Sequence, residues 1–443
     1  MPLPPPDLRA AAYNGLKLYP LSDHPLRHLL NNELHARPPV ALSPPERVSH
    51  LAIHSGDQAA GEDHAALVRL CERYGVTPPH AGITHFSGEF VPFRLKWERH
   101  TEFVTYTFFI AGDFADPFGT PVIDQVARDW LAQLPGQVLV AAHVAVLPRE
   151  APAPTIEQLA AWFSPDSLMG SLVAGGAAAA YTDHRIQADG FSRILIHDRE
   201  LGKRQAGRLV QRLLEAETYR MMALLAFPMA AEIAPEIARC EREFAELTAS
   251  MAESFGPQHE RQLLDRLIQL AATIERLAAS SSYRFRASRA YHALVERRIQ
   301  EMREERISGL PTLAESMERR FLPAMRTCIS VAERLKSLSE RVSRASGLLR
   351  TRVDITIEEQ NRDLLQSVDR RARLQLLLNE TVEGLSVVVI SYYALSLVHY
   401  VLTGIEHAHT GIDPELVTGV AAPVILVVVW WLLRRIRKRL RLE

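Results

Sequence analysis

Residues 385–404 read LSVVVISYYALSLVHYVLTG and contain no Asp, Glu, Lys or Arg. At a rise of about 1.5 Å per residue, a helix of this length crosses a hydrocarbon core of roughly 30 Å. A second such run, LVTGVAAPVILVVVWWLL at 416–433, carries Trp430 and Trp431, residue types that favour the membrane interface. The short linker IEHAHTGIDPE joins the runs. The pair predicts a transmembrane hairpin spanning 384–434; the alternative is two buried helices of a soluble core.

Basic residues flank both ends of the hairpin. They are Arg370, Arg371 and Arg373 before it and Arg434, Arg435, Arg437, Lys438, Arg439 and Arg441 after it. The linker contains no Lys or Arg. The positive-inside rule then predicts a multi-pass protein of the bacterial inner membrane with cytoplasmic N- and C-termini. The basic tail, 435–443, either binds anionic lipid headgroups or serves as a topology anchor.

Composition narrows the class of protein. The 443 residues are 47% hydrophobic and 23% charged, within the ordinary globular range. The 51 basic and 52 acidic residues balance to a net charge of −1, which argues against nucleic acid as a partner. Cys71, Cys240 and Cys328 form no CxxC pair, so we expect a reducing compartment without disulfides. Residues 1–20 lack a secretory signal pattern and predict a flexible lead.

Residues 21–200 predict an α+β domain with a largely antiparallel sheet. Aromatic and β-branched runs predict strands at 48–55, 83–90, 93–100, 103–112 and 137–147. Two or three more strands are expected within 171–197, with a hairpin turn at 188–190. Helices are expected at 63–75 and 121–134. We interpret Gly175 and Gly176 as strand glycines that admit close packing.

From 201 to 383 the pattern becomes helical. Apolar residues recur every three or four positions in two series: Leu263, Leu267, Leu270, Ile274 and Leu277, then Cys328, Val331, Leu335, Leu338, Val342, Ala345 and Leu349. This spacing predicts a long antiparallel helical or coiled-coil stalk. No strong breaker lies between Ala324 and Glu383, so the last helix can continue into the first apolar run. Such a rod needs to pack against preceding helices, against copies of itself, or both.

Motif searches favour no enzymatic activity. The chain contains neither a G-x-x-x-x-G-K-[ST] loop nor H-E-x-x-H, and we predict no catalytic residue and no cofactor. One dense polar cluster precedes the first strand and comprises His24, His28, Asn31, Glu33, His35 and Arg37. His24 and His28 have the spacing of metal ligands on one helix face. Because a third ligand is missing, we favour a role in capping and tying this segment to the sheet.

A polar stripe follows one face of the first apolar run. Its members are Tyr392, Ser396, His399 and Thr403. Polar groups in hydrocarbon face a helix partner or a water-filled path, so the stripe predicts either helix–helix hydrogen bonds in an oligomer or the lining of a pore. Beyond it, Glu406, Asp413 and Glu415 form an acidic cluster that would attract metal cations at an outer mouth. The alternative is an ordinary solvated loop.

Two stretches resemble an uncharacterised bacterial family of predicted membrane-anchored proteins. They are NELHARPP at 32–39 and ETVEGLSVVVISYY at 380–393. The resemblance extends over nearly the whole chain. It implies a membrane anchor and no established activity.

The expected architecture also resembles the CorA-type magnesium transporter family. That family combines a cytoplasmic α/β domain, a stalk helix entering two C-terminal spans, an acidic outer loop and a basic tail. Asp413-Pro414-Glu415-Leu416 is similar to the M-P-E-L of its outer loop. The Gly-Met-Asn filter that follows a Tyr is absent, because Tyr400 precedes Val401-Leu402-Thr403-Gly404 here.

These patterns lead to two expectations. The first is a homo-oligomeric inner-membrane channel or transporter of CorA-like build, with a divalent cation as transported or regulatory ion. The alternative is a membrane-anchored cytoplasmic interaction, scaffold or sensor protein without transport activity. A likeness of architecture does not decide between them.

Overall fold

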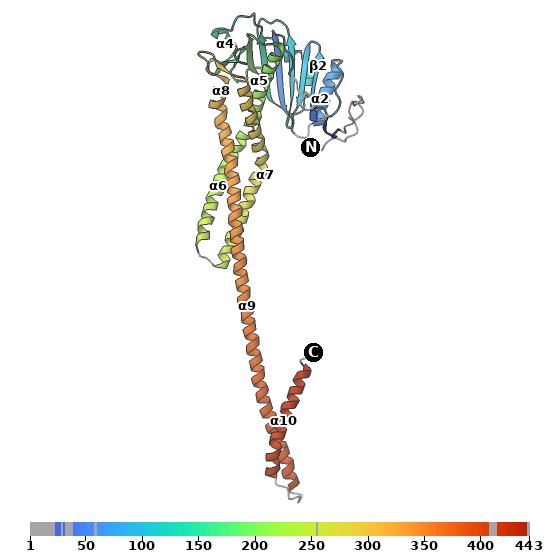
Figure 1. Ribbon diagram of the computed structural model, residues 1–443, viewed down its shortest axis with the longest axis vertical. Helices are drawn as coiled ribbons and strands as arrows, with labels where there is room; N and C mark the ends of the chain where they lie inside the picture. Colours follow the sequence, from blue (N-terminus) through green and yellow to red (C-terminus); the bar gives the residue numbers. More distant parts are fainter. Residues whose placement is uncertain are drawn as a thin grey trace. The chain divides into compact units, whose positions relative to one another are not determined.

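The protein combines a sheet domain at the N-terminal side with long C-terminal helices (Figure 1). This computed structural model describes residues 23–27, 30–31, 39–56, 60–253, 256–406 and 414–440. The chain forms two compact units, Met1–Ala249 with Leu267–Ser343 and Ser250–Arg266 with Arg344–Glu443. The mixed α/β class expected from the sequence is confirmed.

The first unit contains a nine-stranded sheet in the order β2-β3-β4-β1-β5-β8-β7-β6-β9. The strands are β1 Glu46–His54, β2 His85–Phe90, β3 Phe93–Arg99, β4 Phe103–Ala111, β5 Gln137–Leu147, β6 Met169–Val173, β7 Ala178–Thr182, β8 Ser192–Asp198 and β9 Glu305–Arg306. Strands β5 and β8 pair in parallel, and the other neighbours pair antiparallel. The sheet is therefore largely antiparallel, as predicted.

Two local expectations need correction, and one strand was not predicted. Gly175 and Gly176 form the turn between β6 and β7, where φ values of 69° and 83° favour glycine, rather than lying inside a strand. The helix expected at 121–134 is broken into a 3₁₀ turn, η3 (Val122–Gln125), and the short α3 (Arg128–Leu131), because Val126 is extended. Strand β9 was not expected, since two charged residues carry no apolar alternation.

Helices make up most of the rest of the described chain. They are α2 Ala60–Arg73, α4 Ile156–Trp162, α5 Lys203–Leu224, α6 Ala226–Ala252, α7 Pro257–Glu301, α8 Leu313–Ser316, α9 Leu322–Glu406 and α10 Pro414–Leu440, with a 3₁₀ turn η4 at Pro165–Ser167 and a π-helical turn η5 at Met317–Phe321. The predicted continuity of the last stalk helix into the first apolar run is confirmed, since α9 is a single helix.

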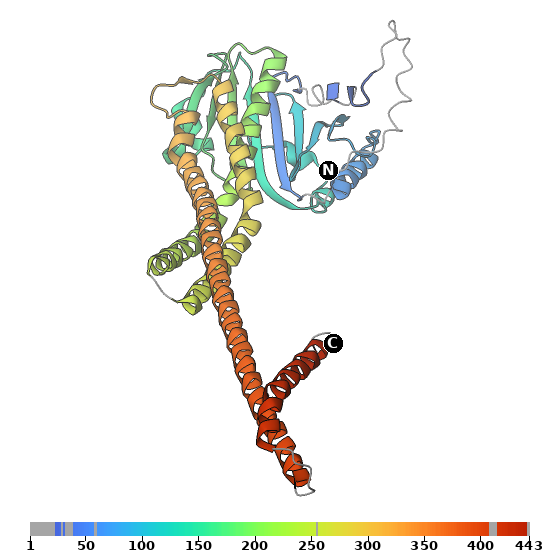
Figure 2. The same ribbon diagram turned by 60° about the horizontal axis from the view of Figure 1, so that its bottom comes forward.

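Strand periodicity distributes β3 and β4 between two cores. Trp97 and Tyr106 lie in the aromatic core shared with α2. Lys96 and Thr107, their neighbours in sequence, are on the opposite face because successive side chains alternate. That opposite face is covered by α5, which crosses the sheet (Figure 2).

Helix α5 approaches the segment before β1 very closely. The Leu42 N–H donates to the Lys203 carbonyl at 3.0 Å. A methyl group added to Gly207 would overlap the carbonyl oxygen of Val40. Glycine is therefore required at this point of the helix, despite its cost to helix stability of roughly 1 kcal/mol.

Helices α6, α7 and the first part of α9 pack together within the first unit. Arg334 of α9 pairs with Glu241 of α6, and Arg341 lies 4.9 Å from the Phe244 ring centroid. Arg276 of α7 pairs with Glu236 at 3.6 Å. The two apolar series predicted from the sequence are buried, with Ala345 half-buried. Helical periodicity thus identified the packed faces correctly.

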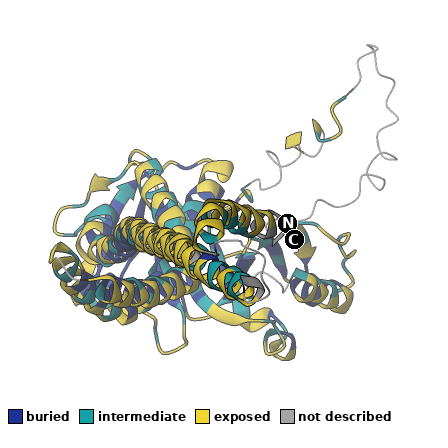
Figure 3. Cartoon of the chain, turned by 90° about the horizontal axis from the view of Figure 1, so that it is seen from below, coloured by how far each residue is buried: buried dark blue, intermediate teal, exposed yellow. Residues whose placement is uncertain are grey.

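In the second unit, Arg352 of α9 pairs with Glu260 of α7 at 2.7 Å. From Glu358 to Val382 the helix is exposed, and yellow marks such residues along the helices in Figure 3. Three helical stretches are long and apolar enough to cross a membrane: Lys203–Ala252, Leu313–Gly404 and Glu415–Arg435. One-third of the residues in the most apolar part of the first stretch are buried, whereas none are buried in that part of the third.

Candidate functional site

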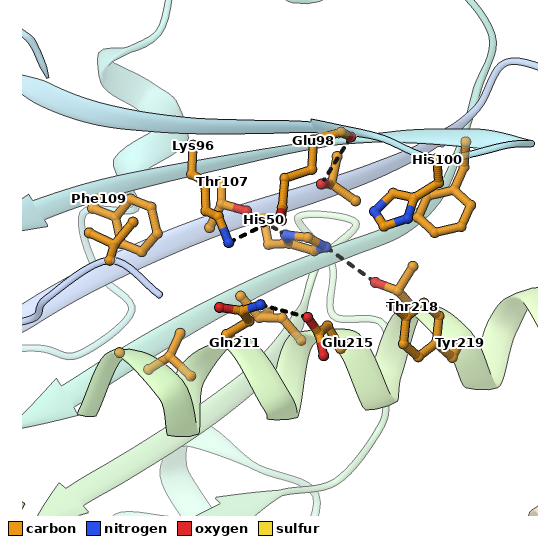
Figure 4. A pocket seen from close by; sticks show the side chains of 16 residues that line it. His50, Lys96, Glu98, His100, Thr107, Phe109, Gln211, Glu215, Thr218 and Tyr219 are labelled. Carbon is orange, nitrogen blue, oxygen red and sulfur yellow. Dashed lines mark hydrogen bonds and ion pairs between the residues drawn. The ribbon is translucent and has the colours of Figure 1, made fainter. Parts of the chain in front are cut away.

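A small cavity lies between the sheet and α5, with side chains converging from both (Figure 4). Its volume is about 40 Å³, which accommodates about three water-sized groups. The sheet contributes residues of β1, β3 and β4, and the helix contributes the face that includes Gln211, Glu215 and Thr218. Apolar walls with a few convergent polar groups are typical of small-molecule sites.

Lys96 is the buried cation of this cavity. Its side chain is 7% exposed, and its Nζ lies 3.1 Å from Oε1 of Glu98, two residues along β3. An ammonium group has three donors. In the part of the chain that the structure describes, Glu98 is the one ion-pair partner of Lys96. Donor capacity therefore remains for a bound acceptor.

His50 forms the floor of the cavity and is neutral. Its Nδ1 lies 2.9 Å from Oγ1 of Thr107, and its Nε2 lies 3.2 Å from Oγ1 of Thr218. Burial, together with the nearby positive charge of Lys96, lowers the pKa of His50 to about 3. A neutral imidazole has one donor and one acceptor, and the two hydroxyls can complement both. His50 thus links β1, β4 and α5.

The helix side of the cavity carries the compensating charges. Gln211 Nε2 donates to Oε1 of Glu215 at 2.7 Å, and Oε2 of Glu215 pairs with Arg298 of α7. Lys96 and Arg298 thereby balance Glu98 and Glu215. A cavity with separated but balanced charges favours a zwitterion or a small polar molecule over a highly charged ligand.

The cavity wall continues into the helical part of the first unit. Tyr219 of α5 stacks on Tyr291 of α7 with ring centroids 5.9 Å apart. These rings belong to an apolar cluster with Phe103, Met317 and Phe321, of which the last two lie in the π-helical turn η5 directly before α9. Two residues that line the cavity, Phe103 and Tyr219, therefore share an apolar cluster with the residues directly before α9.

The predicted pore-lining residues all lie on α9. His399 Nδ1 is 3.3 Å from Oγ1 of Thr418 on α10, and Thr403 Oγ1 donates to the His399 carbonyl at 2.8 Å. Tyr392 is 67% exposed, and Ser396 is half-buried. The structure thus brings His399 and Thr403 together and pairs His399 with the second apolar helix. This contact lies within one chain, so both helix–helix hydrogen bonds in an oligomer and the lining of a pore stay predictions.

Several predicted site residues lie outside the described part of the chain: His28, Glu33, His35, Arg37 and Asp413, and the side chain of Glu406. Glu415 is exposed in the first turn of α10 and Asn31 is exposed. His24 Nδ1 accepts from the Leu26 N–H at 3.2 Å, a local turn contact of the capping kind. Among the described residues, no group of three or more His, Cys, Asp and Glu side chains could hold a metal ion.

Sequence reasoning missed the cavity because its residues match no motif. The available signal was weak: Lys96 and Glu98 alternate with Leu95 and Trp97 in a strand, and His50 interrupts an apolar strand. Polar residues on an alternating face ordinarily indicate solvent exposure. Here the face is buried by α5, which comes from residues about 100 positions later.

A family model described as "Protein of unknown function (DUF3422)" matches residues 22–440. The chain belongs to this family. DUF3422 membership confirms the expectation of an uncharacterised family that covers most of the chain, and it assigns no activity. No curated protein matches the sequence.

The buried imidazole of His50 predicts acid sensitivity. The unfolded chain binds this proton near pH 6.5 and the folded protein only near pH 3, so the unfolded state holds more protons between these values. Stability is therefore full above pH 6.5 and falls as the pH decreases, by about 2 kcal/mol at pH 5 for this one residue. Urea denaturation at pH 7 and pH 5 measures this loss, which we expect to be smaller in His50→Gln.

His143 contributes a residual loss in both proteins, because burial lowers its pKa to about 4. The exposed His80 provides the matched control, and His80→Gln is expected to retain the wild-type dependence. Identical pH dependence in the wild type and His50→Gln would contradict the buried neutral state.

Proposed function

We propose that this DUF3422 protein is a membrane-anchored ligand-binding protein. The sheet domain takes a small zwitterion or carboxylate in the cavity under α5, and the apolar helices attach the domain to the membrane. The observation that carries the proposal is the buried Lys96, whose ammonium has one ion-pair partner among the described residues while facing a cavity with balanced charges. The proposal develops the alternative of a membrane-anchored sensor protein without transport activity and adds a binding site and a class of ligand.

Contacts between the cavity and the start of α9 support a sensor function rather than a role as a membrane anchor alone. The cavity residues Phe103 and Tyr219 belong to the same apolar cluster as Met317, Phe321 and Met325 at the start of α9. A ligand that shifts Tyr219 would act directly on this helix end. Such coupling requires two alternative arrangements of the contact between Tyr219 and the start of α9.

Membrane attachment is supported by the second unit. Apolar residues of the uncharged runs are largely exposed, as lipid-facing side chains would be. Arg434 and Arg435 lie 4.9 Å and 5.0 Å from the ring centroids of Trp430 and Trp431, and both residue types favour the interface. We propose that residues 385–404 and 416–433 cross the bacterial inner membrane as a hairpin with cytoplasmic termini.

Self-association is supported by the exposed stretch of α9. Its large apolar residues are between 55% and 69% exposed: Leu364, Leu365, Val368, Leu374, Leu376, Leu377, Leu378 and Val382. An isolated helix in water is marginal, and helices in proteins are stabilised mainly by packing of an apolar face. A homo-oligomer, in which copies of this stretch pack together, would bury these side chains.

Ligand binding is tested on the full-length protein in detergent with a panel of amino acids and short-chain carboxylates. We expect at least one compound to bind measurably by calorimetry and Lys96→Met to weaken it by about tenfold, the usual loss of a charge-assisted hydrogen bond. Gln211→Leu should weaken binding through the helix side of the cavity.

Lys203→Met serves as the control, because Lys203 is exposed at the start of α5 and does not line the cavity. The proposal fails if no compound in the panel binds, or if Lys96→Met and Lys203→Met bind it equally well.

The membrane hairpin is tested by thiol labelling. Cys71, Cys240 and Cys328 are buried, so a Thr410→Cys protein offers one accessible thiol in the linker. A membrane-impermeant maleimide added to intact cells with a permeabilised outer membrane should label Thr410→Cys and leave Thr101→Cys unlabelled. Equal labelling of both, or recovery of the protein in the soluble fraction without detergent, would refute the hairpin.

Cation conduction is a second candidate, favoured by the polar stripe on α9. Tyr392 is largely exposed within one chain and would face the axis of an oligomer. Metal uptake into proteoliposomes tests it. If the stripe lines a path for ions, the double variant His399→Ala, Thr403→Val should take up less metal than the wild type. Equal uptake by the two proteins, or no uptake by the wild type, would contradict conduction and leave these residues with a role in helix packing.

A further inference from the structure

A second cavity, on the other side of α5, is surrounded by basic side chains. Its volume is about 190 Å³, and its lining includes His184, Arg185, Arg220, Ser316 and Arg320. These residues come from the loop after β7, from α5, from α8 and from the π-helical turn η5. None of them lines the cavity with Lys96, so the two sites are separate.

His184 is held in an uncommon conformation at this cavity. Its φ of 52° lies in the left-handed region, which is unfavourable for a residue other than glycine and occurs preferentially at functional sites. Its Nδ1 lies 3.0 Å from Oε2 of Glu217. Its Nε2 is buried and has no hydrogen-bond partner among the described residues. A bound group would supply the missing partner.

Glu217 organises the basic groups around it. Its carboxylate receives Nε of Arg220 at 3.2 Å and Nη2 at 2.5 Å, in addition to His184. Burial raises the pKa of Glu217, but the positive charges of Arg220 and His184 outweigh burial and hold that pKa below its usual range. Glu217 is therefore ionised and fixes both basic side chains at the cavity.

Two further arginines lack a compensating charge. Arg185 and Arg320 are exposed, and the structure gives neither guanidinium an ion-pair partner within the described ranges. The second carboxylate of the cavity, Asp183, already accepts the N–H groups of Ser164 and Arg185. Positive charge therefore exceeds negative charge around the cavity.

From this arrangement we infer that the cavity binds a phosphate group, held by Arg185 and Arg320, with the Nε2 of His184 as a further hydrogen-bonding partner. Guanidinium groups bind phosphate oxygens through paired N–H donors, and Arg is the residue type best suited to this geometry. The volume exceeds that of one phosphate, so a diphosphate or a phosphate ester fits. The site is independent of the ligand proposed for the Lys96 cavity.

The phosphate has two sources, a soluble phosphate compound or a phospholipid headgroup. Isothermal titration calorimetry on the full-length protein in a non-ionic detergent distinguishes them, with inorganic pyrophosphate as one titrant and a water-soluble short-chain phosphatidic acid as the other. We expect saturable binding of at least one. Tighter binding of pyrophosphate assigns a soluble ligand, and tighter binding of phosphatidic acid assigns a lipid.

Arg185→Ala and Arg320→Ala should each weaken the bound titrant by about tenfold, as expected for losing a hydrogen bond to a charged group. Both side chains are exposed, so these proteins should fold, which circular dichroism verifies. Arg208→Ala removes an exposed arginine of α5 outside this cavity and should bind as the wild type does. Saturation by neither titrant, or the same loss in Arg208→Ala, would overturn the phosphate site.

Discussion

The packing of α5 across the sheet is the constraint on which the first unit depends. Gly207 lets the helix approach the backbone of Val40, and the apolar face of the helix joins the largest core of the sheet. Because the helix lies so close, polar residues such as Glu217 and Thr218 are buried as well. Buried polar groups are costly unless paired, so each of them requires a partner from another element.

The pairs that these polar residues of α5 form with other elements lie at both candidate sites. Thr218 bonds to His50, Glu215 pairs with Arg298, and Glu217 pairs with Arg220 and His184. Residues 215, 217 and 218 are close in sequence but lie on different sides of α5, because successive residues of a helix are rotated by about 100° about its axis. One helix thereby serves a cavity with balanced charge on one side and a basic cavity on the other. A change in its position would affect both.

Helix α9 has different surroundings along its length. Up to Leu349 its apolar seam is buried, with Arg334 and Arg341 contacting α6. Beyond Val353 the apolar side chains are exposed, and they are followed by the uncharged run. A soluble monomer would leave these surfaces in water at a large hydrophobic cost. This exposed apolar surface is the basis of the proposed membrane attachment and self-association.

Patterns within short stretches of sequence were sufficient to predict much of the fold. Runs of aromatic and β-branched residues located β1 to β5, and the spacing of Leu267, Leu270 and Ile274 identified a packed helix face, since these features depend on neighbours within a few residues. The length and lack of charge of residues 385–404 likewise identified a stretch that can cross a membrane. Where local context was misleading, as at Gly175 and Gly176, a turn conformation replaced the expected close packing.

The candidate sites depend on contacts that no local pattern encodes. Lys96 is buried only because a helix from residues 203–224 covers it, and His184 gains its role only through Glu217 on that same helix. Such pairings join residues distant in sequence, so the residue runs that located the strands could not show which face of the sheet would be covered. The sequence by itself determined the elements, their apolar faces and the capacity to span a membrane. Tertiary structure alone decided which polar groups meet, because only long-range packing removes them from water and forces them to pair.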